Sequence, residues 1–156
     1  MTDYLILLVT LMNKLNESSS IRATIFIEED KSLLAFQTSP IPESFSLRKN
    51  NTNKDIFNLE TSQSLVCQSW NENQTIIKNQ DIHFLHTKQA TYISSIICVP
   101  ISLENYGKIC ILSLDSESKD TFSMKEQDEK IILDIGKRIA LEIISFHSIK
   151  KGSNNE

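Results

Sequence analysis

The chain has 156 residues, of which 40% are hydrophobic and 23% are charged, and its formal net charge is −4. This length and composition suit one globular domain with a hydrophobic core. The acidic balance and the scattered Lys and Arg residues argue against nucleic-acid binding, which needs a basic surface. The acidic start and the short apolar run at residues 4–12 fit neither a secretory signal nor a transmembrane span, so no membrane partner is expected.

The first 40 residues predict a helix followed by a β-hairpin. Apolar residues recur at helical spacing over residues 2–17, at Leu5, Leu8, Met12 and Leu15. Further apolar residues make the first turns hydrophobic nearly all round, so this helix is expected to be buried on more than one side. Two stretches rich in β-branched and aromatic residues, 21–28 and 32–38, flank a polar turn and predict the hairpin.

The middle of the chain predicts less regular structure. Residues 39–58 are rich in proline and asparagine and predict a loop. Residues 59–70 have a helical period, and residues 74–78 predict a short strand. Residues 79–92 combine two histidines with polar residues and give no clear pattern.

The last third of the chain predicts two paired strands and a long helix. Residues 94–103 and 108–115 are apolar stretches joined by a short turn. Residues 123–149 carry an apolar stripe at helical spacing and begin with a capping box formed by Ser123 and Glu126.

Both strands of this pair lack the alternation of a strand with one solvated face. The runs "IICVPI" and "ICIL" are apolar at every position, so both faces of the sheet are expected to be covered. The terminal helices would cover one face and residues 39–92 the other. A sheet covered by loops and short helices is a common place for a small-molecule cavity. The domain is expected to span residues 1–150, with residues 151–156 as a disordered tail.

The order of these elements and several short motifs resemble GAF domains over about residues 3–149. The motifs are Val99-Pro100-Ile101, a hairpin with Gly107, Leu114-Asp115-Ser116, and Phe122 with Glu126 before the long helix. The resemblance implies an α+β, GAF/PAS-like fold with a central antiparallel sheet of about six strands. It also implies terminal helices on one face and a roof of loops and short helices over a ligand pocket on the other.

The resemblance further implies a regulatory role, because GAF domains bind small molecules and often form dimers through their terminal helices. We therefore expect a non-enzymatic sensory domain that binds a small-molecule ligand and signals as a homodimer. Fold does not choose the ligand, and the sequence names neither a ligand nor a cofactor. A degenerate domain that serves only dimerisation or docking is an alternative.

Two GAF subfamilies carry motifs that this chain lacks. Cyclic-nucleotide-binding GAF domains of phosphodiesterases carry an Asn-Lys pair where Leu114-Asp115 stands here. Bilin-binding GAF domains usually carry a cysteine followed by a histidine, a pair that is absent from this sequence. Neither type of ligand is therefore expected.

The cysteines bear on location and on an enzymatic alternative. Cys67, Cys98 and Cys110 are an odd number without close spacing, which argues against disulfides and zinc and favours a reduced, cytoplasmic protein. Free methionine-(R)-sulfoxide reductases are GAF enzymes with a Gly-Val-Cys motif where Cys67 stands, so Cys67 is the candidate catalytic thiol. Those enzymes also need cysteines in the following loop, and residues 79–95 contain none. The favoured interpretation of Cys67 is an ordinary buried cysteine.

The candidate ligand-binding residues lie in and beside the expected roof. They are Trp70, Asp81, His83, Phe84, Tyr92, Ser94 and Ser95. Trp70 is expected to staple the short helix to the sheet, to stack on a ligand, or to do both. The hydroxyls of Tyr92, Ser94 and Ser95 would either orient a ligand or satisfy backbone groups where the strand begins.

The histidines His83 and His86 are three residues apart, with Asp81 nearby. Two imidazoles and a carboxylate are residue types that bind a metal or an anion. No cysteine or third histidine is close in sequence, which favours an ordinary loop position and no metal site.

Overall fold

The computed structural model describes residues 1–17, 20–39, 56–80, 82, 93–123 and 125–152. Its elements in chain order are α1 (Thr2–Leu15), β1 (Arg22–Glu29), β2 (Ser32–Thr38), β3 (Ile56–Asn58), α2 (Leu65–Glu72), β4 (Ile76–Lys78), β5 (Ser95–Leu103), β6 (Gly107–Ser116) and α3 (Lys125–Gly152). The strands form one six-stranded antiparallel sheet in the order β3-β2-β1-β6-β5-β4. The predicted α+β fold with a central sheet of six strands is confirmed.

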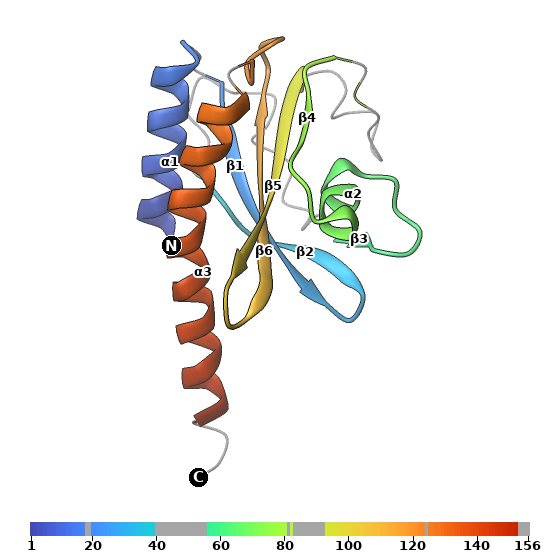
Figure 1. Ribbon diagram of the computed structural model, residues 1–156, viewed down its shortest axis with the longest axis vertical. Coiled ribbons are helices and arrows are strands. Elements are labelled where there is room, and N and C mark those ends of the chain that lie inside the picture. The colour runs from blue at the N-terminus through green and yellow to red at the C-terminus, as the bar shows by residue number, and fades with distance from the viewer. Residues whose placement is uncertain (18–19, 40–55, 81, 83–92, 124, 153–156) are drawn as a thin grey trace.

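The sheet lies between two layers of helix, with α1 and α3 on one face and the short α2 on the other (Figure 1). Val99 and Leu112 are fully buried in the core that the sheet forms with α1 and α3. Cys98 and Ile111, one residue along each strand, belong to a second core that includes Val66 of α2. Apolar residues therefore face a covered layer on each side of β5 and β6, as the lack of alternation predicts.

Helix α3 approaches the sheet most closely at Gly136. A Cβ atom at this position would lie 2.5 Å from Ile101 Cδ1 and 3.0 Å from Leu112 Cδ1. The glycine lowers the intrinsic stability of the helix by about 1 kcal/mol relative to alanine. It permits the close contact that seats α3 on β5 and β6.

Helix α1 buries one face and exposes another. Leu5, Leu8 and Met12 are fully buried against the sheet and α3. Ile6, Leu7 and Leu11 are 45%, 46% and 40% exposed. Within this chain, helix α1 is therefore buried on one side, and the apolar residues on its other side are exposed, which differs from the expectation.

Two elements in the middle of the chain differ from the prediction. Residues 56–58, predicted as loop, form β3 and pair with β2. Helix α2 begins at Leu65 rather than at residue 59, because the preceding residues form a turn. Asn58 Oδ1 accepts hydrogen bonds from the backbone N–H groups of residues 60 and 61. Ser64 then caps the helix by accepting a hydrogen bond from Cys67 N.

The bounds of the last helix also differ from the prediction. Helix α3 begins at Lys125, two residues after Ser123, so the capping box of Ser123 and Glu126 stays a prediction. The helix continues through Lys151 and Gly152, two residues into the segment predicted as a disordered tail. Within the described ranges, no helix is long and apolar enough to cross a bilayer.

Candidate functional site

The face of the sheet that bears α2, here called the roof face, has an apolar end and a polar end. On β1 and β6, the cross-strand pairs that share this face are Phe26–Ile111, Thr24–Ser113 and Arg22–Asp115. Side chains two residues apart along a strand point to the same face, so the two polar pairs continue the face that Phe26 and Ile111 begin. We call Arg22, Thr24, Ser113 and Asp115 the polar roof cluster.

Arg22 and Asp115 form the charged part of this cluster. Arg22 Nη2 and Nε both donate to Asp115 Oδ2, at 2.7 and 3.0 Å. The two side chains are only 15% and 6% exposed. Removing such a pair from water costs several kcal/mol per ion, which the mutual attraction repays only with good geometry. The pair concentrates a guanidinium and a carboxylate where water is largely excluded.

The hydroxyl part of the cluster lies beside this ion pair. Thr24 Oγ1 lies 3.3 Å from Thr38 Oγ1 on β2, and Ser113 Oγ lies 3.6 Å from Cys98 Sγ on β5. Burial raises the pKa of the Cys98 thiol to about 12, although the hydrogen bond with Ser113 opposes this rise. Cys98 therefore borders the cluster as a neutral thiol.

Trp70 joins α2 to the sheet. Lys108 Nζ lies 4.5 Å from the centroid of the Trp70 ring and donates to the Trp70 backbone carbonyl. Burial lowers the pKa of Lys108. The ring face and the carbonyl near the C-terminal end of α2 both favour the charged ammonium. Trp70 therefore packs against the core under α2 with Lys108 over one ring face, and its stacking on a ligand stays a prediction.

Cys67 lies inside the apolar core under α2. Its side chain is fully buried, and its Sγ lies 3.9 Å from Phe57 O and 3.8 Å from Asn58 O. Carbonyl oxygens are acceptors for a thiol S–H group. These contacts agree with a packed cysteine.

The remaining predicted site residues divide into two groups. Ser95 Oγ donates to Ser118 O at 2.7 Å and accepts from Thr121 N at 3.2 Å, so its hydroxyl satisfies backbone groups. Ser94 N donates to Ser116 O at 2.8 Å. The others, Asp81, His83, Phe84 and Tyr92, lie outside the described residues, as does His86. Across the described part of the chain, no group of three or more His, Cys, Asp or Glu residues is placed to hold a metal.

The polar roof cluster is not among the sites predicted from the sequence. Its signal is the alternation of polar residues at one end of two otherwise apolar strands, at 22 and 24 and at 113 and 115. The Leu114-Asp115-Ser116 motif predicts the end of a strand. Asp115 meets Arg22 only because β6 pairs with β1.

Comparisons with known proteins identify the fold. No family model matches the sequence, and no curated protein matches it. Among solved structures, a GAF domain/HD domain protein from Geobacter sulfurreducens has a TM-score of 0.62 and 13% identity over 95% of this chain and 94% of that one. The GAF domain of an Acinetobacter phosphoenolpyruvate-protein phosphotransferase has a TM-score of 0.61 and 12% identity over 96% of each chain.

A reductase has the same fold. The type II free methionine-R-sulfoxide reductase from Thermoplasma acidophilum has a TM-score of 0.59 and 16% identity over 92% of this chain and 93% of that one. The chain therefore has a GAF-like fold, shared by sensor domains and by enzymes. At these identities the similarity establishes the fold alone.

Proposed function

We propose that this chain is a non-enzymatic GAF-type sensory domain that binds a small polar molecule on the roof face of its sheet. The observation that carries the proposal is the polar roof cluster of Arg22, Thr24, Ser113 and Asp115. A face that only packs against a roof is most stable when apolar, because buried charges and hydroxyls lose hydration. Buried polar groups at one end of an apolar face are what a binding site for a small molecule requires.

In this proposal, four of the residues predicted from the sequence complete the site. Asp81, His83, Phe84 and Tyr92 belong to the segment between β4 and β5, which the resemblance assigns to the roof. Trp70, Ser94 and Ser95 flank that segment in the sequence. Ser95 pairs with Ser116 and therefore faces the side of the sheet that bears α1 and α3, where its hydroxyl contacts residues 118–121. Trp70 contacts Lys108, which lies seven residues along β6 from Asp115.

We also propose that the domain forms a homodimer through its terminal helices. The exposed apolar residues on α1 and α3 are Ile6, Leu7, Leu11, Leu141 and Phe146. The two helices lie side by side on one face of the molecule (Figure 1), so both are accessible to a second copy. Several large apolar side chains exposed on neighbouring helices are typical of an interaction surface.

A methionine-sulfoxide reductase is the second candidate. A Staphylococcus aureus fRMsr solved in complex with its substrate has a TM-score of 0.59 and 16% identity over 89% of this chain and 83% of that one. Cys67 supports this candidate by its position in the sequence. The burial of Cys67 and its contacts with carbonyl oxygens weigh against a reductase. Burial also raises the pKa of Cys98 and of Cys110 to about 12, which weighs against either of them as a second reactive thiol.

The first test is native mass spectrometry of the freshly purified protein and of two variants. We expect a dimer that carries an additional discrete mass, and we expect Arg22→Met to lose that mass while its circular dichroism spectrum remains that of the folded protein. Lys31→Met is the matched control, because Lys31 forms an exposed ion pair with Glu60 at 2.9 Å. A bound mass that persists in Arg22→Met would place the ligand elsewhere. An apo protein that no metabolite stabilises against heat would refute the sensory role.

A further inference from the structure

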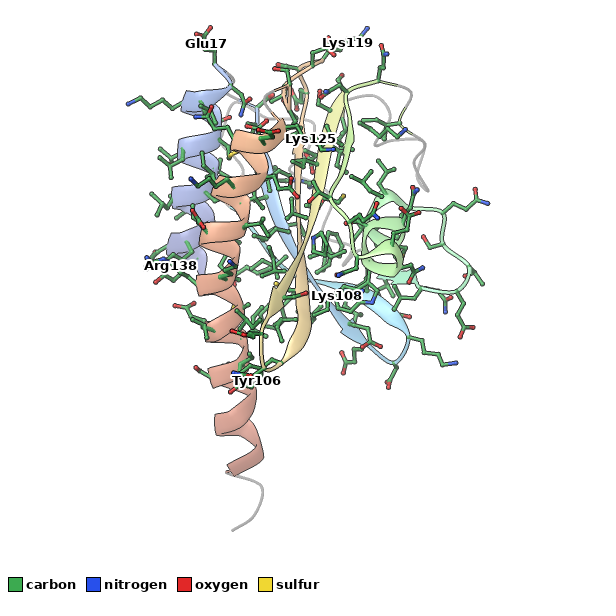
Figure 2. All side chains as sticks on the ribbon, viewed as in Figure 1. Glu17, Tyr106, Lys108, Lys119, Lys125 and Arg138 are labelled. Atoms are coloured by element: carbon green, nitrogen blue, oxygen red, sulfur yellow. The ribbon has the colours of Figure 1, made fainter. Side chains whose placement is uncertain are left out.

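A groove lies at the edge of the sheet, away from the polar roof cluster. It has a volume of about 410 Å³, and its lining includes Thr75, Pro100, Ser102, Lys125, Glu129 and Leu133. These residues come from the segment before β4, from β5 and from the first three turns of α3. Figure 2 shows Lys125 at the end of α3 nearest the upper part of the sheet. The volume lies in the range of small-molecule sites.

The groove exists because β4 covers only part of β5. Pairing between these strands runs from Ile96 to Cys98 and stops there. Pro100, two residues further on, has no N–H group with which to extend a strand ladder. The segment that precedes β4 therefore leaves the edge of the sheet, and the space between it and α3 stays open.

Two opposite charges line this space without pairing with each other. Lys125 and Glu129 are one helical turn apart on α3, a spacing at which Lys and Glu commonly form an ion pair. Within the described residues, neither takes part in a salt bridge. Glu129 Oε1 instead accepts a hydrogen bond from the hydroxyl of Thr75 across the groove.

The placement of Lys125 does not serve helix stability. A cation in the first turn opposes the helix dipole, and lysine before glutamate is the less favourable order for an i,i+4 pair. Lys125 is exposed, and no salt bridge involves its ammonium within the described residues. Its placement is therefore not explained by the stability of the helix.

We propose that the groove binds a small zwitterion of the α-amino acid type. The ligand carboxylate contacts Lys125, its ammonium contacts Glu129, and its side chain rests on Pro100 and Leu133. A ligand with one charge would meet a like charge in the same groove, whereas a zwitterion complements both. Because the groove is open to water, we expect a Kd on the order of 1 mM. The site is independent of the function proposed for the roof face.

The test is an NMR titration of the ¹⁵N-labelled full chain with L-leucine, N-acetyl-L-leucine and L-leucinamide. The two derivatives lack the ammonium and the carboxylate charge, respectively. We expect leucine to shift the amides of Thr75, Ser102, Lys125 and Glu129 with saturation, and each derivative to bind at least about tenfold more weakly. Equal shifts with all three probes, or no shift at about 20 mM leucine, would overturn the proposal.

Matched variants separate the groove from its surroundings. Lys125→Met and Glu129→Gln should each weaken leucine binding at least about tenfold, while Glu129→Gln keeps an acceptor for Thr75. The controls are Lys130→Met and Glu126→Gln, at exposed positions on the same helix that do not line the groove. Leucine shifts confined to residues around Arg22 and Asp115 would also overturn the groove site, and would identify leucine as a roof-face ligand instead.

Discussion

Arg22 and Asp115 lie directly opposite each other on β1 and β6, and two nitrogens of the arginine donate to one oxygen of the carboxylate. The next residue, Ser116, faces the other side of the sheet. Its hydroxyl lies 2.7 Å from Ser20 Oγ and accepts from Thr121 Oγ1 at 2.9 Å. Ser20 precedes β1 and Thr121 precedes α3, so the charged end of the roof face adjoins the links to both terminal helices.

The ion pair makes Arg22→Met a severe change. The substitution leaves the buried Asp115 carboxylate without its guanidinium, and breaking a buried pair in this way costs about 3–5 kcal/mol. We expect urea unfolding to show a loss of this size. The double variant Arg22→Met/Asp115→Leu should recover much of it, because neither charge is then left buried.

The exposed pair between Lys31 and Glu60 provides the control. Its side chains are 74% and 65% exposed, so Lys31→Met should change the free energy of unfolding by less than about 1 kcal/mol. If Arg22→Met and Lys31→Met changed the free energy of unfolding equally, the result would contradict the burial of the ion pair between Arg22 and Asp115.

The location of this ion pair was not predictable from the sequence, although much of the fold was. Strand β2 has the predicted bounds, and α1 follows the helical spacing of Leu5, Leu8 and Met12. These signals are local. Arg22 and Asp115 are 93 positions apart and meet only through the register of β1 with β6. Side-chain pattern indicates which strands are buried but does not select their partners.

The secondary-structure prediction for the middle of the chain was wrong for a related reason. Strand β3 has three residues, and its strand conformation comes from pairing with β2 rather than from its own sequence. The apolar spacing extended α2 back to Leu59, which does pack against the second core but precedes the helix. The hydrogen bonds of Asn58 and Ser64 to the backbone decide where the helix begins.

The buried thiols predict low reactivity in the folded protein. Burial raises the pKa of Cys98 and Cys110 from 9.0 to about 12, so each carries about a thousandfold less thiolate than an ordinary cysteine near pH 8. We expect Ellman's reagent to leave both unmodified until urea is added. Rapid modification of either thiol in the native protein would contradict this burial.

The same shifts have a consequence for stability. The folded state holds these two protons at a pH where the unfolded chain releases them, so the free energy of unfolding falls as pH rises above about 9. Cys98→Ala should reduce this loss between about pH 8 and pH 10. A stability profile in this range that is the same for both proteins would argue against the raised pKa.

The proposed dimer predicts a specific effect of charge on α1. Leu7 is 46% exposed, and glutamate there would place a charge in an interface made by the terminal helices. We expect Leu7→Glu to be monomeric by sedimentation equilibrium, with an unchanged circular dichroism spectrum. Ile56→Glu is the control, because Ile56 is an exposed apolar residue on the edge strand β3. A dimer that survives Leu7→Glu, or dissociates equally in both variants, would exclude this interface.

The junction of the terminal helices holds a buried acid, Asp128. Its Oδ1 accepts from Asn16 Nδ2 at 3.0 Å, and its Oδ2 has no hydrogen-bond partner among the described residues. Burial raises the pKa of Asp128, and the hydrogen bond from Asn16 opposes the rise. The native state therefore keeps this proton at a pH where the unfolded chain has lost it. Its contribution to stability is present below the ordinary aspartate pKa and is lost as pH rises through the folded one.

Asp128→Asn removes this pH dependence while keeping an acceptor for Asn16. Relative to the wild type, we expect the variant to gain stability as pH rises from about 4 to about 7, measured by urea unfolding at several pH values. Asp134→Asn, at an exposed position of the same helix, should follow the wild-type profile. Parallel profiles for wild type and Asp128→Asn would contradict a raised pKa for this buried carboxyl group.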